Sequence, residues 1–274
     1  MNSILQKLKH QFMLFNYRRN YYLAKLFPKK VPIAPLYYLP SGFSVHMVAN
    51  TGIRIVDNFC TPEEAEYLIK KARDHLARSK VIVGNKAVDD SGRTSSHAVA
   101  FHRHYQDSNV LPIIARGAML AGVPMDHAEQ IYVSRYGDGE FYHGHYDFSD
   151  SFMSDHRLCT MLIYLNDLEE DQGGVTYFKE LNIAIQPKAG RAVIWTNMNP
   201  DGSIHPETAH AALPPRGEGI EKWVIQIWFR PYQMHPIHEK LAARQTSTGV
   251  PLKGDEELPP GTWIPSNTAA QPSA

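Results

Sequence analysis

A histidine and an aspartate two positions apart, His145 and Asp147, are the residues whose types and spacing point most directly to chemistry. In an extended segment, residues i and i+2 face the same side, so both side chains could bind one metal ion. A third candidate ligand, His210, lies far downstream. Two histidines and one carboxylate on one face of iron leave its other positions open, which is the ligand set of non-haem Fe(II) oxygenases. Because His-x-Asp is common by chance, the pattern needs support from other residues.

A lysine, Lys222, opens the last apolar run of the sequence, Lys222–Phe229. An oxygenase of this kind needs a two-electron co-reductant, and 2-oxoglutarate would fill two of the open metal positions. Its far carboxylate then needs a fixed cation, which a lysine on an inward-facing strand could supply. The alternative is that Lys222 is simply exposed at a strand end.

Alternation along two predicted strands places polar groups on inward faces. On the run from Leu158 to Leu165, one face carries Thr160, Leu162 and Tyr164. On the last run, one face carries Lys222, Val224, Gln226 and Trp228. Buried hydroxyl and ammonium groups need partners, so we expect these faces to line a pocket. Cys159 has the opposite parity and is predicted to be a small core residue.

Two further histidines compete as metal ligands. His205 lies five residues before His210, and His143 lies two residues before His145. His143 has no acid two residues later, which favours His145.

The elements that must position these residues change in character along the chain. Residues 53–59 are predicted to form a short strand, followed by a helix that starts at Thr61 with Pro62 in its first turn and Glu64 closing a capping box. A second helix is expected near 109–121. From Glu129 onward, runs with a period of two are separated by glycine turns, which predicts an antiparallel sandwich or barrel. These predicted strands are 130–136, 158–165, 175–178, 183–186, 191–196 and 222–229. The predicted fold class is α+β.

Length and composition exclude several classes of protein. The chain has 274 residues, 43% hydrophobic and 20% charged, with equal numbers of basic and acidic residues. No apolar stretch is long enough to span a bilayer, and no secretory signal is recognisable. The two cysteines, Cys60 and Cys159, favour a reducing compartment. We therefore expect a cytoplasmic location, with mitochondrial or peripheral membrane association left open.

Three segments are predicted from composition. Residues 1–50 form a basic, aromatic N-terminal extension, whose first 30 residues hold seven Lys/Arg and no acid. We favour a helix that packs on the domain over a lipid-binding, RNA-binding or transit segment. Residues 51–233 form the catalytic domain. Residues 234–274 are rich in Pro, Gly, Ser and Thr and are predicted to form a loose tail.

The sequence resembles the catalytic domain of prolyl 4-hydroxylases, within the Fe(II)/2-oxoglutarate dioxygenases. The similarity covers roughly residues 53–232, and its matching pieces run in family order. They are Asp57-Asn58-Phe59 with Thr61-Pro62-Glu63-Glu64, Ser79-Lys80-Val81, Arg93-Thr94-Ser95-Ser96, Tyr136 with Gly139 and Tyr142 before His145-Tyr146-Asp147, Leu162-Ile163-Tyr164-Leu165-Asn166-Asp167, Gly173-Gly174-Val175-Thr176-Tyr177-Phe178, and His210-Ala211-Ala212 with Lys222-Trp223.

The resemblance implies a double-stranded β-helix (jelly-roll) core supported by N-terminal helices. It implies that His145, Asp147 and His210 bind Fe(2+), with His210 preferred to His205, and that Lys222 binds the C5 carboxylate of 2-oxoglutarate. It adds O2 and L-ascorbate as reactants and a proline-containing peptide or protein as substrate, hydroxylated at C4 of proline. Further co-substrate contacts are implied for Tyr136, Thr160 and Tyr164. Positions around a peptide groove are implied for Arg93, Ser95, Glu129, Arg157 and Trp228.

Some residues depart from the family pattern, and they bear on the substrate. The link between His210 and Lys222 is lengthened by residues 214–219, Phe229-Arg230 replaces an apolar residue and a histidine, and basic residues follow Ser96 (His97, His102, Arg103 and His104). A small-molecule substrate is therefore the first alternative. An inactive peptide-binding or sensing domain and an oxygenase acting on nucleic acid are further alternatives, although no nucleic-acid partner is expected. The oligomeric state is left open.

Overall fold

The computed structural model describes residues 43–48, 51–83, 86–99, 107–147, 157–199 and 203–230. The predictions for the rest of the N-terminal extension, for His102, Arg103 and His104, and for the C-terminal tail lie outside these residues. Within the described part, strands dominate, and two α-helices and three short 3-10 helices accompany them.

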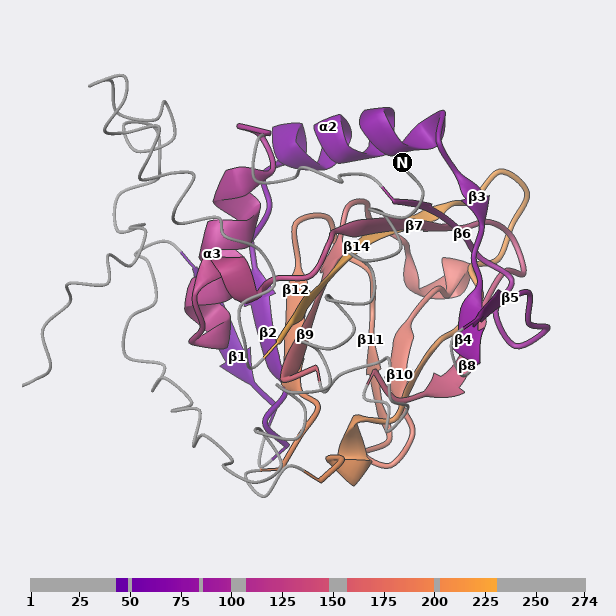
Figure 1. Cartoon of the computed structure of the whole chain (residues 1–274). Helices are drawn as coiled ribbons and strands as arrows, with labels where there is room; N and C mark the ends of the chain where they lie inside the picture. Colours follow the sequence, from indigo (N-terminus) through magenta and orange to yellow (C-terminus); the bar gives the residue numbers. More distant parts are fainter. Residues whose placement is uncertain are drawn as a thin grey trace, which may run out of the picture.

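The larger sheet has eight antiparallel strands and runs through the centre of the molecule (Figure 1). Its order is β1 (Ser44–Met47), β2 (Arg54–Asp57), β12 (Ala192–Thr196), β9 (Cys159–Tyr164), β14 (Lys222–Phe229), β7 (Tyr132–Tyr136), β6 (Ser96–Val99) and β3 (Ala77–Arg78). β1 lies inside the predicted N-terminal extension and pairs with β2 from Ser44 to Met47.

The smaller sheet has four antiparallel strands and faces part of the larger one. Its order is β11 (Ile183–Ile185), β10 (Thr176–Phe178), β13 (His210–Ala212) and β8 (Tyr142–His145). A separate hairpin joins β4 (Val81–Val83) and β5 (Lys86–Val88).

From β7 to β14 the chain crosses repeatedly between the two sheets, and only β10 and β11 follow each other within the smaller sheet. In chain order, β7, β9, β12 and β14 belong to the larger sheet, whereas β8, β10, β11 and β13 belong to the smaller one. Eight strands that cross between two packed antiparallel sheets in this way form a jelly roll. The predicted α+β class with a double-stranded β-helix core is confirmed.

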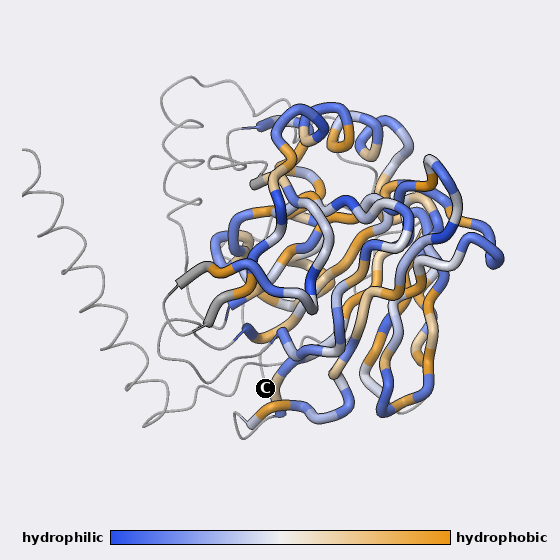
Figure 2. The backbone as a smooth tube through the Cα atoms, turned by 90° about the vertical axis from the view of Figure 1, so that its right-hand side faces the viewer, coloured by the Kyte–Doolittle hydropathy of each residue, from blue (hydrophilic) through white to orange (hydrophobic). Residues whose placement is uncertain are grey.

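The helix α2 (Pro62–Arg73) begins as the sequence predicts. Thr61 caps it, and the side chain of Glu64 accepts a hydrogen bond from the Thr61 N–H, completing the capping box. Its buried residues are Ala65, Leu68 and Ala72, so one face packs on the domain while polar residues remain outside. Figure 2 shows this alternation along the helix at the top of the molecule.

The helix α3 (Leu111–Ala121) is buried over most of its surface and ends at Gly122, whose φ of 69° suits glycine in a C-cap. The 3-10 helices are η2 (Met125–His127), η3 (Glu170–Gln172) and η4 (Pro206–Thr208).

Two apolar clusters separate the layers of the fold. The first joins both helices to one face of the larger sheet, through residues such as Met161, Ile163 and Ile225. The second lies between the sheets and contains Leu162, Tyr164 and Val224 from the larger sheet with Phe178 and Ile185 from the smaller one. The helices therefore support the back of the larger sheet and leave its inner face for the site.

Among the described residues, the structure contains no helix long and apolar enough to cross a membrane.

Candidate metal centre

His145, Asp147 and His210 meet on the smaller sheet. His145 ends β8, Asp147 lies two residues after it, and His210 begins β13. β8 and β13 are antiparallel neighbours, and their register places His210 opposite His145. One ligand atom from each residue lies within 4.8 Å of the others, and both Asp147 and His210 are buried. The structure thus brings together three residues that are far apart in the sequence.

The hydrogen bonds of the two imidazoles fix which nitrogen is free. His145 Nδ1 lies 2.8 Å from the carbonyl oxygen of His143, and His210 Nδ1 lies 2.9 Å from that of Thr208. A carbonyl oxygen only accepts, so each Nδ1 carries the proton and each Nε2 keeps its lone pair. These Nε2 atoms lie 3.6 and 3.7 Å from the carboxylate oxygens of Asp147. The donor set fits a divalent metal ion of the iron type.

The ionisation states favour metal binding as well. Burial alone would raise the pKa of Asp147, but His210 and His145 outweigh it and hold the pKa of this carboxyl below its usual range. Burial, together with His145, lowers the pKa of His210 to about 4. At neutral pH the centre therefore offers an ionised carboxylate and a neutral imidazole at position 210, the forms that a metal requires.

A buried hydrogen-bond chain supports Asp147 from the larger sheet. The hydroxyl of Thr160 on β9 donates to Asp147 Oδ2 at 2.8 Å, and Asn197 Nδ2 donates to the Thr160 hydroxyl at 2.9 Å. The co-substrate contact that the family resemblance implies for Thr160 stays a prediction, and the structure adds a hydrogen bond from its hydroxyl to the Asp147 carboxylate. The sequence analysis missed Asn197, which directly follows β12 and has no apolar periodicity to mark it.

Lys222 lies on the inner face of β14 and is only 1% exposed, so its alternative interpretation as a solvent-facing residue is wrong. Among the residues that the structure describes, its Nζ has no hydrogen-bond partner. The ammonium lies 5.2 Å from the ring centroid of Tyr136 and 5.6 Å from that of Tyr164. Burial lowers the pKa of Lys222 to about 7. A buried ammonium group without a partner could pair with a carboxylate that enters the site.

The hydroxyl of Tyr164 is held away from that cation. It donates to Thr176 Oγ1 at 2.7 Å and lies 3.2 Å from the carbonyl oxygen of Ile185. Burial raises the pKa of Tyr164 beyond its usual range and also raises that of Tyr136, so both are neutral phenols.

Glu129, Arg157 and Trp228, predicted to surround a groove, lie together. Arg157 donates to both carboxylate oxygens of Glu129, at 2.7 and 3.1 Å, and its guanidinium carbon lies 3.6 Å from the Trp228 ring centroid. Arg230 also pairs with Glu129 at 2.6 Å. Burial would raise the pKa of Glu129, but the two arginines hold it below its ordinary value. The chain's departure from the family pattern at Arg230 thus has a structural role.

Arg93 is connected to the metal centre through Tyr142, whereas Ser95 lies in the interior. The Arg93 guanidinium lies 4.5 Å from the Tyr142 ring centroid, and the Tyr142 ring stacks on His145 at 3.6 Å. Ser95 is fully buried, and its hydroxyl donates to Ser79 Oγ at 3.0 Å.

The competing histidines do not join the metal-ligand group. His143 is exposed and contributes only its carbonyl oxygen to the orientation of His145. The carbonyl oxygen of His205 accepts from the hydroxyl of Thr208 at 2.8 Å.

Known proteins match the part of the chain that carries these residues. The profile of the 2OG-Fe(II) oxygenase superfamily matches residues 131–230. Probable prolyl 4-hydroxylase 3 of Arabidopsis thaliana is 31% identical over 198 residues, which cover 64% of this chain and 67% of the relative. Prolyl 4-hydroxylase 1 of the same organism is 32% identical over 197 residues, which cover 65% and 68%.

Among solved structures, a viral collagen prolyl hydroxylase from Paramecium Bursaria Chlorella virus-1, in complex with 2OG, is similar with a TM-score of 0.48 and 23% identity. The similarity covers 67% of this chain and 98% of that one.

Proposed function

Because this chain belongs to the prolyl 4-hydroxylase family of the 2OG-Fe(II) oxygenase superfamily, and is thus a 2-oxoglutarate-dependent dioxygenase, we propose that it hydroxylates C4 of prolyl residues in a peptide or protein. The observation that supports this most is the convergence of His145, Asp147 and His210 on the inner side of a jelly roll whose β14 begins with the buried Lys222.

The three converging residues would hold Fe(2+) through the two Nε2 atoms and the Asp147 carboxylate. Bound iron would supply the activation of O2, which couples the conversion of 2-oxoglutarate to succinate and CO2 to hydroxylation of a C–H bond. L-Ascorbate is proposed as the reductant that keeps the iron ferrous.

The protein's own contribution is to bind and orient the reactants. Lys222 would pair with the C5 carboxylate of 2-oxoglutarate, in a space bounded by Tyr136 and Tyr164. Thr160 would keep Asp147 in its ligating orientation. The apolar cluster between the sheets would exclude water from this region and so limit oxidation without substrate.

The peptide would bind beside the metal centre, on residues that carry unused polar groups. The indole Nε1 of Trp228 has no hydrogen-bond partner in the described part of the chain, and the Arg157 guanidinium covers the same ring. The exposed part of this cation–aromatic pair could pack against a proline ring. Arg93 is also proposed as a peptide contact, whereas Ser95 is fully buried and could support the groove only from behind.

We also propose how the chain is divided and where in the cell it is located. The proposed division is into an extension (1–50), a catalytic domain (51–233) and a tail (234–274). The proposed location is cytoplasmic, supported by Cys60 and Cys159, which are both buried free thiols.

The test is to incubate Fe(II)-loaded protein with 2-oxoglutarate and ascorbate, with and without proline-rich peptides. We expect peptide-stimulated CO2 release and a mass gain of one oxygen atom on proline, both absent in Asp147→Ala. Indifference to peptides, with stimulation by a small metabolite, would identify a small-molecule oxygenase instead.

A further inference from the structure

The position of Lys222 is fixed by hydrogen bonds of the residues on either side of it in the sequence, because its own ammonium group has no hydrogen-bond partner among the described residues. Lys222 is the first residue of β14, and residues 216–219 just before it are exposed. A lysine at such a position has a stem long enough to turn its charge out to water. The buried position of Lys222, where burial depresses its pKa, therefore requires that the backbone around it be fixed.

The side chain of Asn166 supplies one part of that restraint. β9 ends at Tyr164, and its backbone ladder with β14 continues only through the Leu165 N–H, which donates to the Trp223 carbonyl at 2.8 Å. One residue further, the Asn166 amide takes the place of a peptide group. Its Nδ2 donates to the Glu221 carbonyl at 2.8 Å, and its Oδ1 accepts from the Trp223 N–H at 2.8 Å.

These two hydrogen bonds lie on either side of Lys222. The amide of Asn166 thus extends the sheet by one further pairing, after the strand that would normally provide it has ended. Because both peptide units next to Lys222 are held, the direction of its side chain is set.

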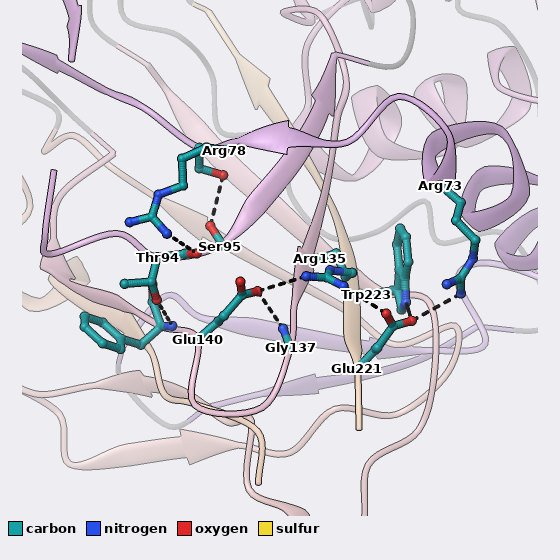
Figure 3. Close-up of polar contacts among 11 residues, drawn as sticks. Arg73, Arg78, Thr94, Ser95, Arg135, Gly137, Glu140, Glu221 and Trp223 are labelled. Carbon is teal, nitrogen blue, oxygen red and sulfur yellow. Dashed lines mark hydrogen bonds and ion pairs between the residues drawn. The ribbon is translucent and has the colours of Figure 1, made fainter. Parts of the chain in front are cut away.

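The side chain of Glu221 supplies the second part, on the outer face (Figure 3). Its carboxylate accepts from Trp223 Nε1 at 2.9 Å, from Arg135 at 3.1 Å and from Arg73 at 3.2 Å. Arg73 belongs to the last turn of α2 and also lies 4.9 Å over the Trp223 ring. The start of β14 is therefore tied to β7 and to α2.

The network extends to the turn that follows β7. Arg135 lies 3.5 Å from Glu140, whose carboxylate accepts from the Gly137 N–H at 2.7 Å (Figure 3). Glu221 and Trp223 point away from the cavity because they alternate with Lys222 along the strand. Their contacts leave the inner face free.

We infer that Asn166, assisted by Glu221, is a positioning residue that keeps the Lys222 ammonium directed at the co-substrate. The inference rests on the proposed function, because it assigns Asn166 a part in the binding of 2-oxoglutarate by Lys222. Asn166 touches no reactant itself.

The experiment compares two 2-oxo acids bound to the full-length, Fe(II)-loaded protein without oxygen. The affinity of 2-oxoglutarate is measured by titration calorimetry. The affinity of pyruvate is measured by its competition with 2-oxoglutarate in the same titration. Pyruvate has the same 2-oxo acid group but lacks the distal carboxylate, so the ratio of the two affinities reports on the contact with Lys222.

In Asn166→Ala we expect this ratio to fall about tenfold, with the affinity for pyruvate unchanged, because two hydrogen bonds that orient the cation are lost. In turnover, KM for 2-oxoglutarate should rise while kcat at saturation stays the same. Asn166→Asp keeps the acceptor for the Trp223 N–H but sets a carboxylate oxygen against the Glu221 carbonyl oxygen, so its ratio should fall as well. If Asn166→Ala does not fold, the ratio measured for Asn166→Asp tests the inference instead.

Asn199→Ala is the matched control. Its amide also holds a loop, by donating to Ser203 Oγ and to the Ile204 carbonyl at 3.0 Å each, so the control should leave the ratio unchanged. A wild-type ratio in the Asn166 variants, or equal losses of both ligands, would overturn the positioning role. Lys222→Met distinguishes the two proposals. A wild-type affinity ratio in Lys222→Met would refute the pairing of Lys222 with 2-oxoglutarate. A ratio that collapses in Lys222→Met but keeps its wild-type value in the Asn166 variants would refute only the positioning role of Asn166.

Discussion

At the scale of single residues, the Asp147 carboxylate is restrained from two directions. The imidazoles of His145 and His210 lie close to its oxygens, and the Thr160 hydroxyl donates to Oδ2. Thr160 is in turn held by Asn197. Groups that orient a metal ligand in this way contribute to metal affinity.

Replacing Thr160 by valine should therefore weaken Fe(II) binding about 10- to 100-fold, because the carboxylate loses its orienting donor. Thr160→Ser keeps the hydroxyl and should retain affinity close to that of the parent. The measurement is an anaerobic Fe(II) titration of both variants. Equal affinities for the valine and serine variants would contradict the role given to the hydroxyl.

The buried lysine makes the stability of the metal-free protein depend on pH. Burial lowers the pKa of Lys222 from its ordinary 10.5 to about 7, so between these values the unfolded state binds more protons than the folded one. Stability contributed at this site should rise with pH across that window, by up to about 1.4 kcal/mol per pH unit. Below pH 7 the full cost of burying the charge remains.

Lys222→Met should remove this pH dependence and make the metal-free protein more stable than the parent at pH 6.5. Denaturant unfolding from pH 6.5 to 9.5 measures it. A constant difference between variant and parent over that range would show that the ammonium is not held in a dry site.

The site residues that the sequence alone predicts are those whose side-chain type is characteristic of metal or carboxylate binding. Histidine, aspartate and lysine at the centre were identified in this way, whereas Glu129, Arg157 and Trp228, which the structure brings together, were implied only by the family resemblance. Asn166 and Asn197 were not, because an amide has no characteristic spacing and acts through partners that lie far away in the chain. Only the folded structure reveals those partners.

At the scale of elements, the strands that carry the ligands are the ones hardest to predict. The apolar runs that became β7, β9, β10, β11, β12 and β14 were predicted, and so were both helices. β8 reads Tyr-His-Gly-His and β13 has three residues, so neither shows apolar alternation. Their pairing with each other, rather than local preference, makes them strands.

The turn between β11 and β12 depends on a glycine. Gly190 has a φ of +76°, and a Cβ added there would lie 2.3 Å from the Cys60 carbonyl oxygen. Its own carbonyl accepts from the N–H groups of Phe59 and Cys60, which join this turn to the start of α2. Both the backbone and the space around it therefore exclude a side chain.

Gly190→Ala should cost about 1–3 kcal/mol of unfolding free energy, because it adds a steric clash to the strain of a left-handed conformation. Gly52→Ala is the control, since Gly52 has a similar φ of +72° but nothing within 4 Å of the added Cβ. Denaturant unfolding compares them. A loss at Gly190 no larger than that at Gly52 would mean that the close approach to Cys60 is not important.

At the scale of the whole molecule, the metal centre lies where the two sheets meet. Its two histidines belong to the smaller sheet and Asp147 lies just beyond β8, whereas Thr160, which holds Asp147, belongs to the larger sheet. The helices are packed on the far side of the larger sheet and do not enter the site. A metal bound here would link strands that are distant in the chain.

Fe(II) should consequently stabilise the folded protein, by about 2.7 kcal/mol when its concentration is 100 times the dissociation constant. In His210→Ala this stabilisation should disappear, because one of the three ligands is missing. Anaerobic thermal unfolding with and without Fe(II), and after chelation, measures the effect. The same stabilisation in His210→Ala as in the parent would place the metal elsewhere.

The position of Lys222 also has a consequence for how turnover ends. Succinate keeps the carboxylate that Lys222 is proposed to bind, so the reaction leaves the proposed ion pair between Lys222 and the product intact. Accumulated succinate should therefore compete with fresh 2-oxoglutarate, and the rate of the enzyme should follow the balance between these two acids in its surroundings as well as the supply of peptide.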